Sequence, residues 1–213
     1  LVLATGGGAM VNAAYSSGTP ALGVGVGNAV ITVDDTADLD AAAEKIRLSK
    51  TLDLAASCSS DNAVILLDEI YEPMLEKLKA QGGYLCNDEE KTALRNALWD
   101  DELHINTAMV AQPPEKIAQM AGISIPEGVA FFIVTEDGWG PTHPFSGEKL
   151  SVIMALYRAR DIDHAIELTQ NIQAYQGQGH SCGIYSSSDA NIMKLAERSE
   201  EHTSELQSPD HLV

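Results

Sequence analysis

Short apolar runs alternate with amphipathic segments along the chain. The apolar runs predict strands, and segments in which apolar or small residues recur every three or four positions predict helices. The predicted strands are residues 1–4, 21–24, 29–33, 63–67, 129–134, 150–157 and 181–186. The predicted helices are residues 10–17, 39–48, 70–80, 116–121 and 162–173, with a last helix from Asp189. This alternation is typical of an α/β protein in which helices cover a parallel sheet.

Polar residues mark where several of these elements begin. Asp161 is placed to cap the helix 162–173, and the segment from Asp34 to Asp38 supplies caps for the helix 39–48. After Thr51 the sequence changes to a loop of small and polar residues. We therefore place a domain boundary near Thr51.

Composition and charge exclude several classes of function. The 213 residues include 13 Lys and Arg against 31 Asp and Glu, a formal net charge of −18. Nucleic acids and anionic membrane surfaces bind clustered basic residues, so we expect neither as a partner. No apolar run in the sequence has the length needed to cross a membrane.

The cysteines and histidines predict neither a disulfide framework nor a metal site. The three cysteines are widely spaced and form no CxxC pair, which argues against a disulfide scaffold or a zinc ribbon and favours a reducing, cytoplasmic location. The six histidines show no HxH or HExxH spacing, so we expect no metal.

Both ends of the chain are unusual. The sequence opens inside an apolar run, without an initiator Met or a signal-peptide pattern, so we expect the natural N-terminus to be missing. Residues 198–213 are polar and lack helical or strand periodicity. They look like the conceptual translation of a sequencing adapter, and we expect a non-native tail; the alternative is a natural disordered tail. Without this tail 12 basic residues face 27 acidic ones, a net charge of −15.

Three features can carry chemistry, and each also has a structural interpretation. The turn Thr5-Gly6-Gly7-Gly8 joins a predicted strand to a predicted helix, where backbone N–H groups can hold a phosphate, but an ordinary tight turn uses glycines in the same way. Cys58 lies among small polar residues before a predicted strand and is either inert or presented to a cleft. Glu148 is either a surface carboxylate or a ligand for hydroxyl groups.

Other residues are less informative by themselves. Cys86 lies next to acidic residues that disfavour a thiolate, and Cys182 falls within a predicted strand and is most simply a core residue. The alternating glycines of 23–27 allow close approach of a ligand or another backbone, or mark an ordinary bend. The residues around His143 and His180 assign no role to either histidine.

Five segments, in this order and at these spacings, resemble the aldehyde dehydrogenase superfamily, and within it the CoA-acylating branch. They are Ala4-Thr-Gly-Gly-Gly8, Gly23-Val-Gly-Val-Gly-Asn28, Ser57-Cys58-Ser-Ser-Asp-Asn62, Gly147-Glu-Lys-Leu-Ser151 and Gly179-His-Ser181. The resemblance runs from Leu1 to about Glu197 and implies a fragment with an α/β aldehyde dehydrogenase-like fold. Residues 1–51 are then the C-terminal part of a Rossmann-like nucleotide-binding domain, and residues 52–197 are most of the catalytic domain.

The resemblance also implies roles for individual residues. Cys58 is the nucleophile, Thr5, Gly6 and Gly7 lie at the phosphates of the cofactor, and Glu148 binds the ribose beside the nicotinamide. The Cys58 thiolate adds to an aldehyde, the thiohemiacetal passes a hydride to NAD or NADP, and a thioester remains.

One departure from the hydrolytic members of the family selects the second nucleophile. Those members carry a glutamate general base in the segment before the catalytic cysteine, where it activates water. Here Val24 lies near that position, and residues 21–33 contain no carboxylate. Transfer of the acyl group to coenzyme A therefore fits this sequence better than hydrolysis.

The resemblance leaves the substrate open. The loops around Cys58 and His180 look most like those of acylating sulfoacetaldehyde dehydrogenases, but acetaldehyde, propionaldehyde and succinate semialdehyde remain alternatives. The other functional readings are a non-acylating NAD(P)-dependent aldehyde dehydrogenase and an inactive nucleotide-fold fragment. The family implies a homodimer or homotetramer at full length. We expect the isolated chain to be insoluble or inactive, because missing strands leave unpaired sheet edges.

Overall fold

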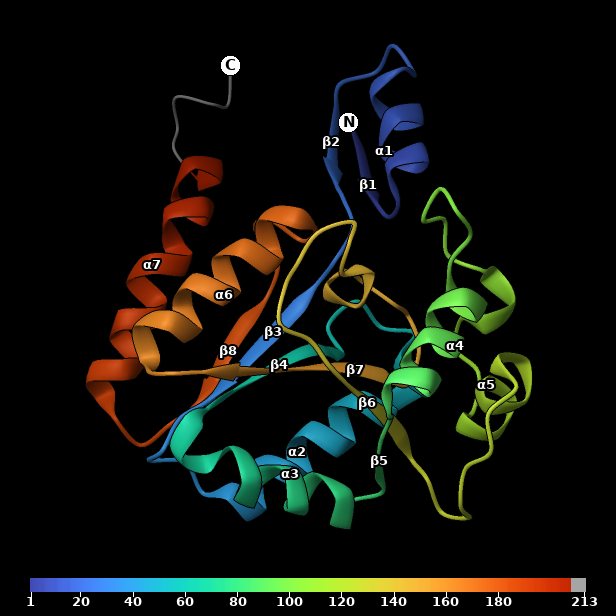
Figure 1. Cartoon of the computed structure of the whole chain (residues 1–213). Coiled ribbons are helices and arrows are strands. Elements are labelled where there is room, and N and C mark those ends of the chain that lie inside the picture. Colours follow the sequence, from blue (N-terminus) through green and yellow to red (C-terminus); the bar gives the residue numbers. More distant parts are fainter. Residues whose placement is uncertain (208–213) are drawn as a thin grey trace.

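The computed structural model in Figure 1 describes the backbone of residues 1–207 and the side chains of residues 1–198. Six strands form its main sheet: β3 (Ala29–Val33), β4 (Asp61–Leu67), β5 (Gly83–Leu85), β6 (Phe131–Thr135), β7 (Ile153–Ala159) and β8 (Cys182–Tyr185). Their order is β5-β6-β7-β4-β3-β8, and every neighbouring pair is parallel. The predicted helix-covered parallel sheet is confirmed.

Helices cover both faces of this sheet. They are α2 (Leu39–Thr51), α3 (Tyr71–Ala80), α4 (Asp88–Leu98), α5 (Pro114–Ala121), α6 (Ile162–Tyr175) and α7 (Asp189–Gln207). Four short 3-10 helices are η1 (Leu52–Ala55), η2 (Asp68–Ile70), η3 (Thr107–Met109) and η4 (Pro144–Ser146). Figure 1 shows α2 and α3 below the sheet, with α6 and α7 above it. The central strand β4 is buried at every position because both its faces are covered, which explains its uninterrupted apolar run 63–67.

The first 24 residues form a second, smaller layer of structure. It consists of β1 (Val2–Thr5), α1 (Gly8–Tyr15) and β2 (Ala21–Val24). The two strands pair in parallel in a sheet of their own, and residues 25–28 connect it to β3. The change of sheet thus falls at 25–28, whereas Thr51, where the sequence suggested a boundary, ends α2 within the larger layer.

Three details differ from the sequence prediction. The elements β5 and α4 were not predicted at all. Strand β7 begins at Ile153 rather than at position 150, because Leu150 has φ 46°, a left-handed conformation that an extended strand excludes. The sequence shows no helical periodicity from residue 198 onward, yet α7 continues to Gln207. Extension of a helix that is already nucleated needs no new nucleus, and this stretch contains good helix formers.

The remaining part of the expected non-native tail, residues 208–213, lies outside the described residues. Within the residues that the structure describes, no helix combines the length and the apolar character needed to cross a membrane.

Candidate functional site

A cleft of about 480 Å³ lies between the small layer and the six-stranded sheet. One wall is the strand-to-helix turn after β1 together with the end of β2, and the other comes from four segments that each precede a strand of the main sheet. The cleft therefore opens at the amino ends of β3, β4, β7 and β8. The lining residues are Thr5, Gly6, Gly7, Val24, Gly25, Val26, Gly27, Ala56, Cys58, Glu148, Leu150 and His180. All five residues to which the sequence assigned a catalytic or cofactor-binding role therefore line one cleft.

Gly27 is the point at which three functional side chains meet. A methyl group at this position would stand 2.7 Å from Cβ of Cys58, 2.9 Å from Nε2 of His180 and 3.1 Å from Oε1 of Glu148. Contacts under 3.0 Å essentially do not occur for a real Cβ atom. Only glycine leaves room for this arrangement, which explains one of the glycines in the segment 23–27.

Cys58 is exposed in the turn between η1 and β4. The backbone just before it is unusual, because Asp53, Leu54 and Ala55 have φ values of 47°, 53° and 60°. A left-handed residue other than glycine costs roughly 1–2 kcal/mol. Ala55 is buried, so packing holds this turn in place between α2 and the Cys58 loop.

Glu148 is held by contacts to its backbone, while one of its carboxylate oxygens stays unpaired. Its amide N–H donates to Oε1 of Gln176 at 2.9 Å. Its own Oε1 is buried and, among the described residues, has no hydrogen-bond partner. Burial raises the pKa of this carboxyl group, and the ammonium groups of Lys149 and Lys50 oppose that shift. The orphaned oxygen is available to a hydroxyl group entering the cleft.

Two buried asparagines fasten the loops of the cleft to the main sheet. Nδ2 of Asn62 donates to Oδ1 of Asn28 at 2.6 Å and to the carbonyl of Gly147 at 2.7 Å. Nδ2 of Asn28 donates to the carbonyls of Ser146 at 2.8 Å and Gln176 at 3.0 Å. Each asparagine thus bridges segments that are far apart in sequence and fixes the loop that carries Glu148.

The glycine turn of the small layer faces the same cleft. Gly7 is the N-cap of α1, and a Cβ atom at Gly7 or Gly8 would meet nothing within 4 Å. The backbone of this strand-to-helix turn is therefore open to close approach by a ligand.

Comparison with known proteins identifies the fold and its family. No family model matches the chain. The acylating sulfoacetaldehyde dehydrogenase of Cupriavidus necator is 42% identical over 199 residues, which are 92% of this chain and 40% of that protein. The bifunctional aldehyde-alcohol dehydrogenase of Escherichia coli is 40% identical over 89% of this chain and 21% of its own length.

Solved structures agree with the sequence relatives. An acetylating aldehyde dehydrogenase from Geobacillus thermoglucosidasius matches with a TM-score of 0.87 and 38% identity, over 91% of this chain and 42% of that chain. The chain belongs to the aldehyde dehydrogenase superfamily. The chain spans well under half the length of these relatives. The predicted resemblance to the acylating members is confirmed, and so is the predicted α/β fold class.

Two lysines that the sequence did not single out are buried behind the cleft. Lys149 donates to the carbonyls of Phe145 at 2.6 Å and Gly147 at 3.0 Å, and burial lowers its pKa well below the usual value. Burial lowers the pKa of Lys50 to about 7, against the opposing effect of Asp61 and Glu148. Nothing local distinguishes these lysines from surface ones, because their burial arises from packing between distant segments.

Asp61 completes this group of buried charges. Its Oδ1 accepts a hydrogen bond from Oγ of Ser49 at 2.9 Å, and its Oδ2 is buried without a partner among the described residues. Burial raises its pKa to about 6, while the Ser49 hydrogen bond and the charge of Lys50 act in the opposite direction.

His180, which the sequence left open, belongs to the site. It is half-buried, its Nδ1 has no hydrogen-bond partner among the described residues, and burial lowers its pKa. The imidazole is therefore mainly neutral at pH 7. The residue by itself gave no chemical signal, although its segment Gly179-His-Ser181 belongs to the resemblance, and the contact with Gly27 places it in the site.

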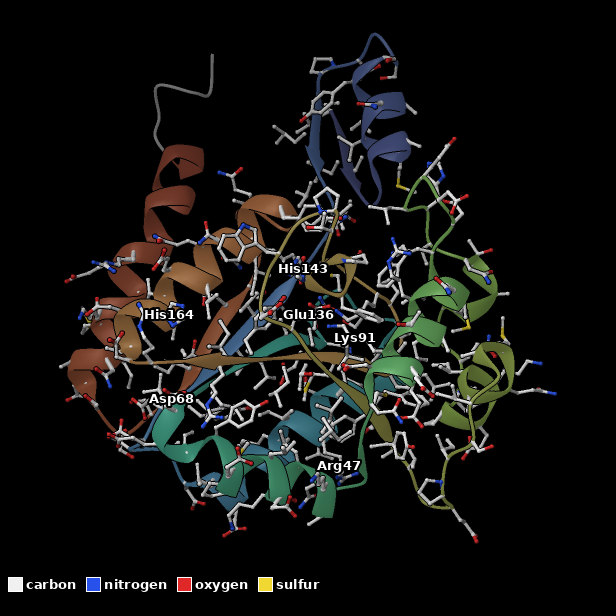
Figure 2. The ribbon with its side chains drawn as sticks, in the orientation of Figure 1. Arg47, Asp68, Lys91, Glu136, His143 and His164 are labelled. Carbon is white, nitrogen blue, oxygen red and sulfur yellow. The ribbon has the colours of Figure 1, made fainter. Side chains whose placement is uncertain are left out.

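The remaining candidates lie outside the cleft. Burial and Glu90 raise the pKa of the Cys86 thiol to about 12, as its acidic neighbours predicted, and Cys182 is only half-buried at the start of β8. Figure 2 shows His143 and Glu136 close together on the loop before β7, with Lys91 nearby. Nδ1 of His143 lies 2.9 Å and Nζ of Lys91 3.2 Å from the Glu136 carboxylate. The ion pair with Lys91 compensates the buried carboxylate, and the contact with His143 braces the loop.

Proposed function

We propose that the full-length protein containing this chain is a CoA-acylating aldehyde dehydrogenase that uses NAD or NADP. The observation that carries this proposal is the cleft itself, in which Cys58, Glu148 and the turn Thr5-Gly6-Gly7 face one another. The fit to a nicotinamide dinucleotide rests on the orphaned Oε1 of Glu148 and on the open backbone at Gly7. The relatives' names support the acylating reaction.

The residues of the chain have distinct tasks in this reaction. The Sγ thiolate of Cys58 attacks the aldehyde carbon, and the carbonyl oxygen takes the charge as a thiohemiacetal forms. Glu148 and the glycine turn hold the ribose and phosphates of the cofactor, which when bound accepts the hydride. Loss of that hydride leaves a thioester on Cys58. The thiolate of coenzyme A then attacks the thioester carbon, and Cys58 leaves as its thiolate.

The wall of the cleft supports the thiol rather than water as the second nucleophile. Val24 lines the same cleft as Cys58, and Glu148 is the only carboxylate among the described lining residues. Water needs a general base to attack a thioester at neutral pH, whereas the thiol of coenzyme A supplies a much better nucleophile. The product is then an acyl-CoA.

The proposal extends to substrate, domains and assembly. Three curated relatives are named sulfoacetaldehyde dehydrogenases, which makes sulfoacetaldehyde the first small aldehyde to test.

The change of sheet suggests that residues 1–24 end the nucleotide-binding domain and that the catalytic domain begins at β3. We further propose a cytoplasmic homodimer or homotetramer.

The test uses the full-length protein with Cys58 intact and as Cys58→Ser, with Cys182→Ser as the matched control. NAD(P)H and acyl-CoA are followed with sulfoacetaldehyde or acetaldehyde, in the presence and absence of coenzyme A. We expect CoA-dependent reduction that Cys182→Ser retains and Cys58→Ser lowers by about a thousandfold or more. Turnover to the free acid without coenzyme A would overturn the acylating assignment, and activity in Cys58→Ser would overturn the nucleophile.

A further inference from the structure

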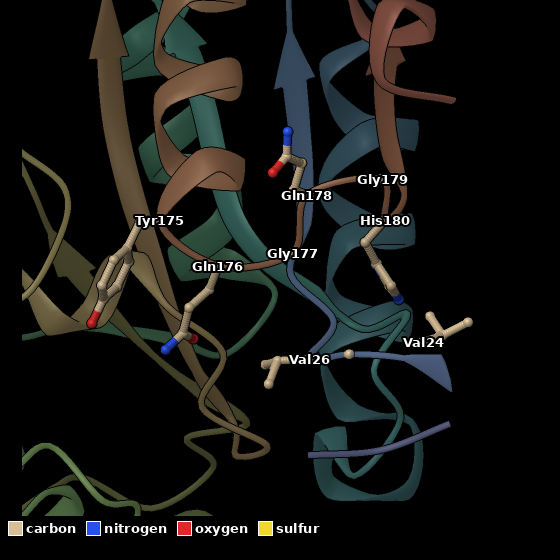
Figure 3. A pocket seen from close by; sticks show the side chains of 9 residues that line it. Val24, Val26, Tyr175, Gln176, Gly177, Gln178, Gly179 and His180 are labelled. Carbon is tan, nitrogen blue, oxygen red and sulfur yellow. The ribbon is translucent and has the colours of Figure 1, made fainter. Parts of the chain in front are cut away.

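A second cavity of about 310 Å³ adjoins the cleft on the far side of the segment 24–26. Figure 3 shows it enclosed by the loop that follows α6, with Val24 and Val26 opposite. The two cavities share Val24, Gly25, Val26 and His180. Nε2 of His180 lies 2.9 Å, and Cβ of Cys58 2.7 Å, from the position that a Cβ atom at Gly27 would take. A substrate bonded to Cys58 therefore has this cavity within reach of its tail.

Gln176 presents a hydrogen-bond donor to the cavity in a fixed orientation. Its Oε1 accepts from the amide N–H of Glu148 at 2.9 Å, which assigns the oxygen and leaves the NH₂ group on the other side. Among the described residues, this Nε2 has no acceptor. In Figure 3, Gln176 points from the loop toward the side of Val26, whereas Gln178 points the opposite way.

The chemistry of the cavity wall favours an oxygen-rich anion. Its nine lining residues include no carboxylate, and its polar side chains come from Tyr175, Gln176, Gln178 and His180. Gly177 and Gly179 both have positive φ, and Gly177 packs closely against Asn28, which fixes the path of the loop beside the cavity. Neutral N–H and O–H donors bind an anionic oxygen by charge-assisted hydrogen bonds, without the need for a lysine or arginine.

We propose that this cavity is the subsite for the tail of the aldehyde, and that Gln176 is its specificity-determining residue. The ligand class is an aldehyde whose tail ends in an anionic oxygen group, a sulfonate or a carboxylate. The donor at Nε2 of Gln176 binds that group while the carbonyl carbon lies at Cys58. This inference rests on the proposed function, because it takes Cys58 as the reacting thiol.

The test reads the subsite without cofactor or coenzyme A. The full-length protein is alkylated with 2-bromoethanesulfonate, 3-bromopropionate or the neutral 2-bromoethanol; Sγ of Cys58 bonds to the carbon that carries bromine, and bromide leaves. Labelling rates at Cys58 are measured by peptide mass spectrometry and divided by each reagent's rate with 2-mercaptoethanol. The variants are Gln176→Glu, which keeps an acceptor for the Glu148 N–H but removes the donor, Gln176→Met, and Gln119→Glu as a remote control of equal charge.

We expect a preference of tenfold or more for an anionic reagent over 2-bromoethanol, retained in Gln119→Glu and lost in both Gln176 variants. The better of the two anionic reagents distinguishes a sulfonate from a carboxylate ligand. Unchanged labelling by 2-bromoethanol in the variants shows that the Cys58 site is intact. No preference in the natural protein, or the same preference in Gln176→Glu, would overturn the subsite. Failure of CoA-dependent NAD(P)H formation contradicts the proposed function instead.

Discussion

At the scale of single residues, the site depends on the missing side chain of a glycine as much as on the side chains that line the cleft. The glycines of 23–27 had two interpretations in the sequence, an ordinary bend or a close approach. The structure assigns the close approach to Gly27, which faces Cys58, Glu148 and His180. Gly25, two residues earlier, has nothing within 4 Å of the position of a Cβ atom and no positive φ. Identical residues in one short segment therefore have different tasks.

This difference predicts the effect of adding one methyl group. In Gly27→Ala, the new Cβ would stand 2.7 Å from Cβ of Cys58, so the Cys58 loop must move. A displacement of about 1 Å at a reacting group can cost on the order of a hundredfold in rate, and we expect a loss of kcat/KM of that size. Gly8→Ala is the matched control and is expected to change kcat/KM little, because Gly8 lies outside the lining of the cleft and a Cβ atom there meets nothing within 4 Å. Equal activity of the two variants would contradict the role of Gly27.

At the scale of elements, most boundaries follow from local signals. Asp38 and Asp161 cap α2 and α6 through hydrogen bonds from backbone N–H groups, as their positions predicted. The missed helix α4 carried a comparable signal. Asn87 and Glu90 form a capping box at the start of α4. Leu94 and Leu98, four residues apart, are the buried residues of the helix. The dense run of acidic residues at 88–90 concealed this pattern because it resembles a solvated loop.

The capping box predicts a measurable contribution to stability. Asn87→Ala removes the side-chain acceptor for the N–H of Glu90, and we expect the free energy of unfolding to fall by about 1 kcal/mol. Asn96→Ala, at an exposed position within α4, is the control and should cost nothing, because alanine is the better helix former. Denaturant unfolding of the full-length protein measures both variants. An equal effect of the two substitutions would show that the capping box contributes no stability.

At the scale of the whole molecule, the two sheets differ in how well their side chains are covered. The main sheet holds the core, whereas the small layer exposes large apolar side chains: Leu1, Leu3, Met10, Tyr15, Leu22 and Val24. Leu3 and Leu22 are partners in the register of β1 and β2, so they lie side by side on one face. They are 73% and 52% exposed, which makes a contiguous apolar patch.

The exposed patch predicts that the isolated 213-residue chain associates with itself. We expect its apparent mass to rise with concentration, and the double substitution Leu3→Asn and Leu22→Asn to reduce that rise. Leu48→Asn is the control, because Leu48 is 50% exposed on α2, outside the small layer. Light scattering after size-exclusion chromatography at several concentrations measures the effect. A chain that remains monomeric throughout would rule this prediction out.

The sequence by itself determined most of the elements and pointed to several residues that line the cleft. Strand and helix positions follow from periodicities of two and 3.6 residues, and caps act over three or four residues, so both are encoded locally. Cys58, Glu148 and the turn Thr5-Gly6-Gly7 belong to motifs that can be recognised without a fold.

Only the tertiary structure decided how these parts come together. The pairing of β3 with β4 and β8 places the change of sheet at residues 25–28. The pairing of β3 with β8 brings His180 to Gly27, more than 100 residues away in sequence, and at the same end of the sheet Gln176 holds Glu148. Such contacts depend on strand order and packing between distant segments, and no local pattern in the chain specifies them.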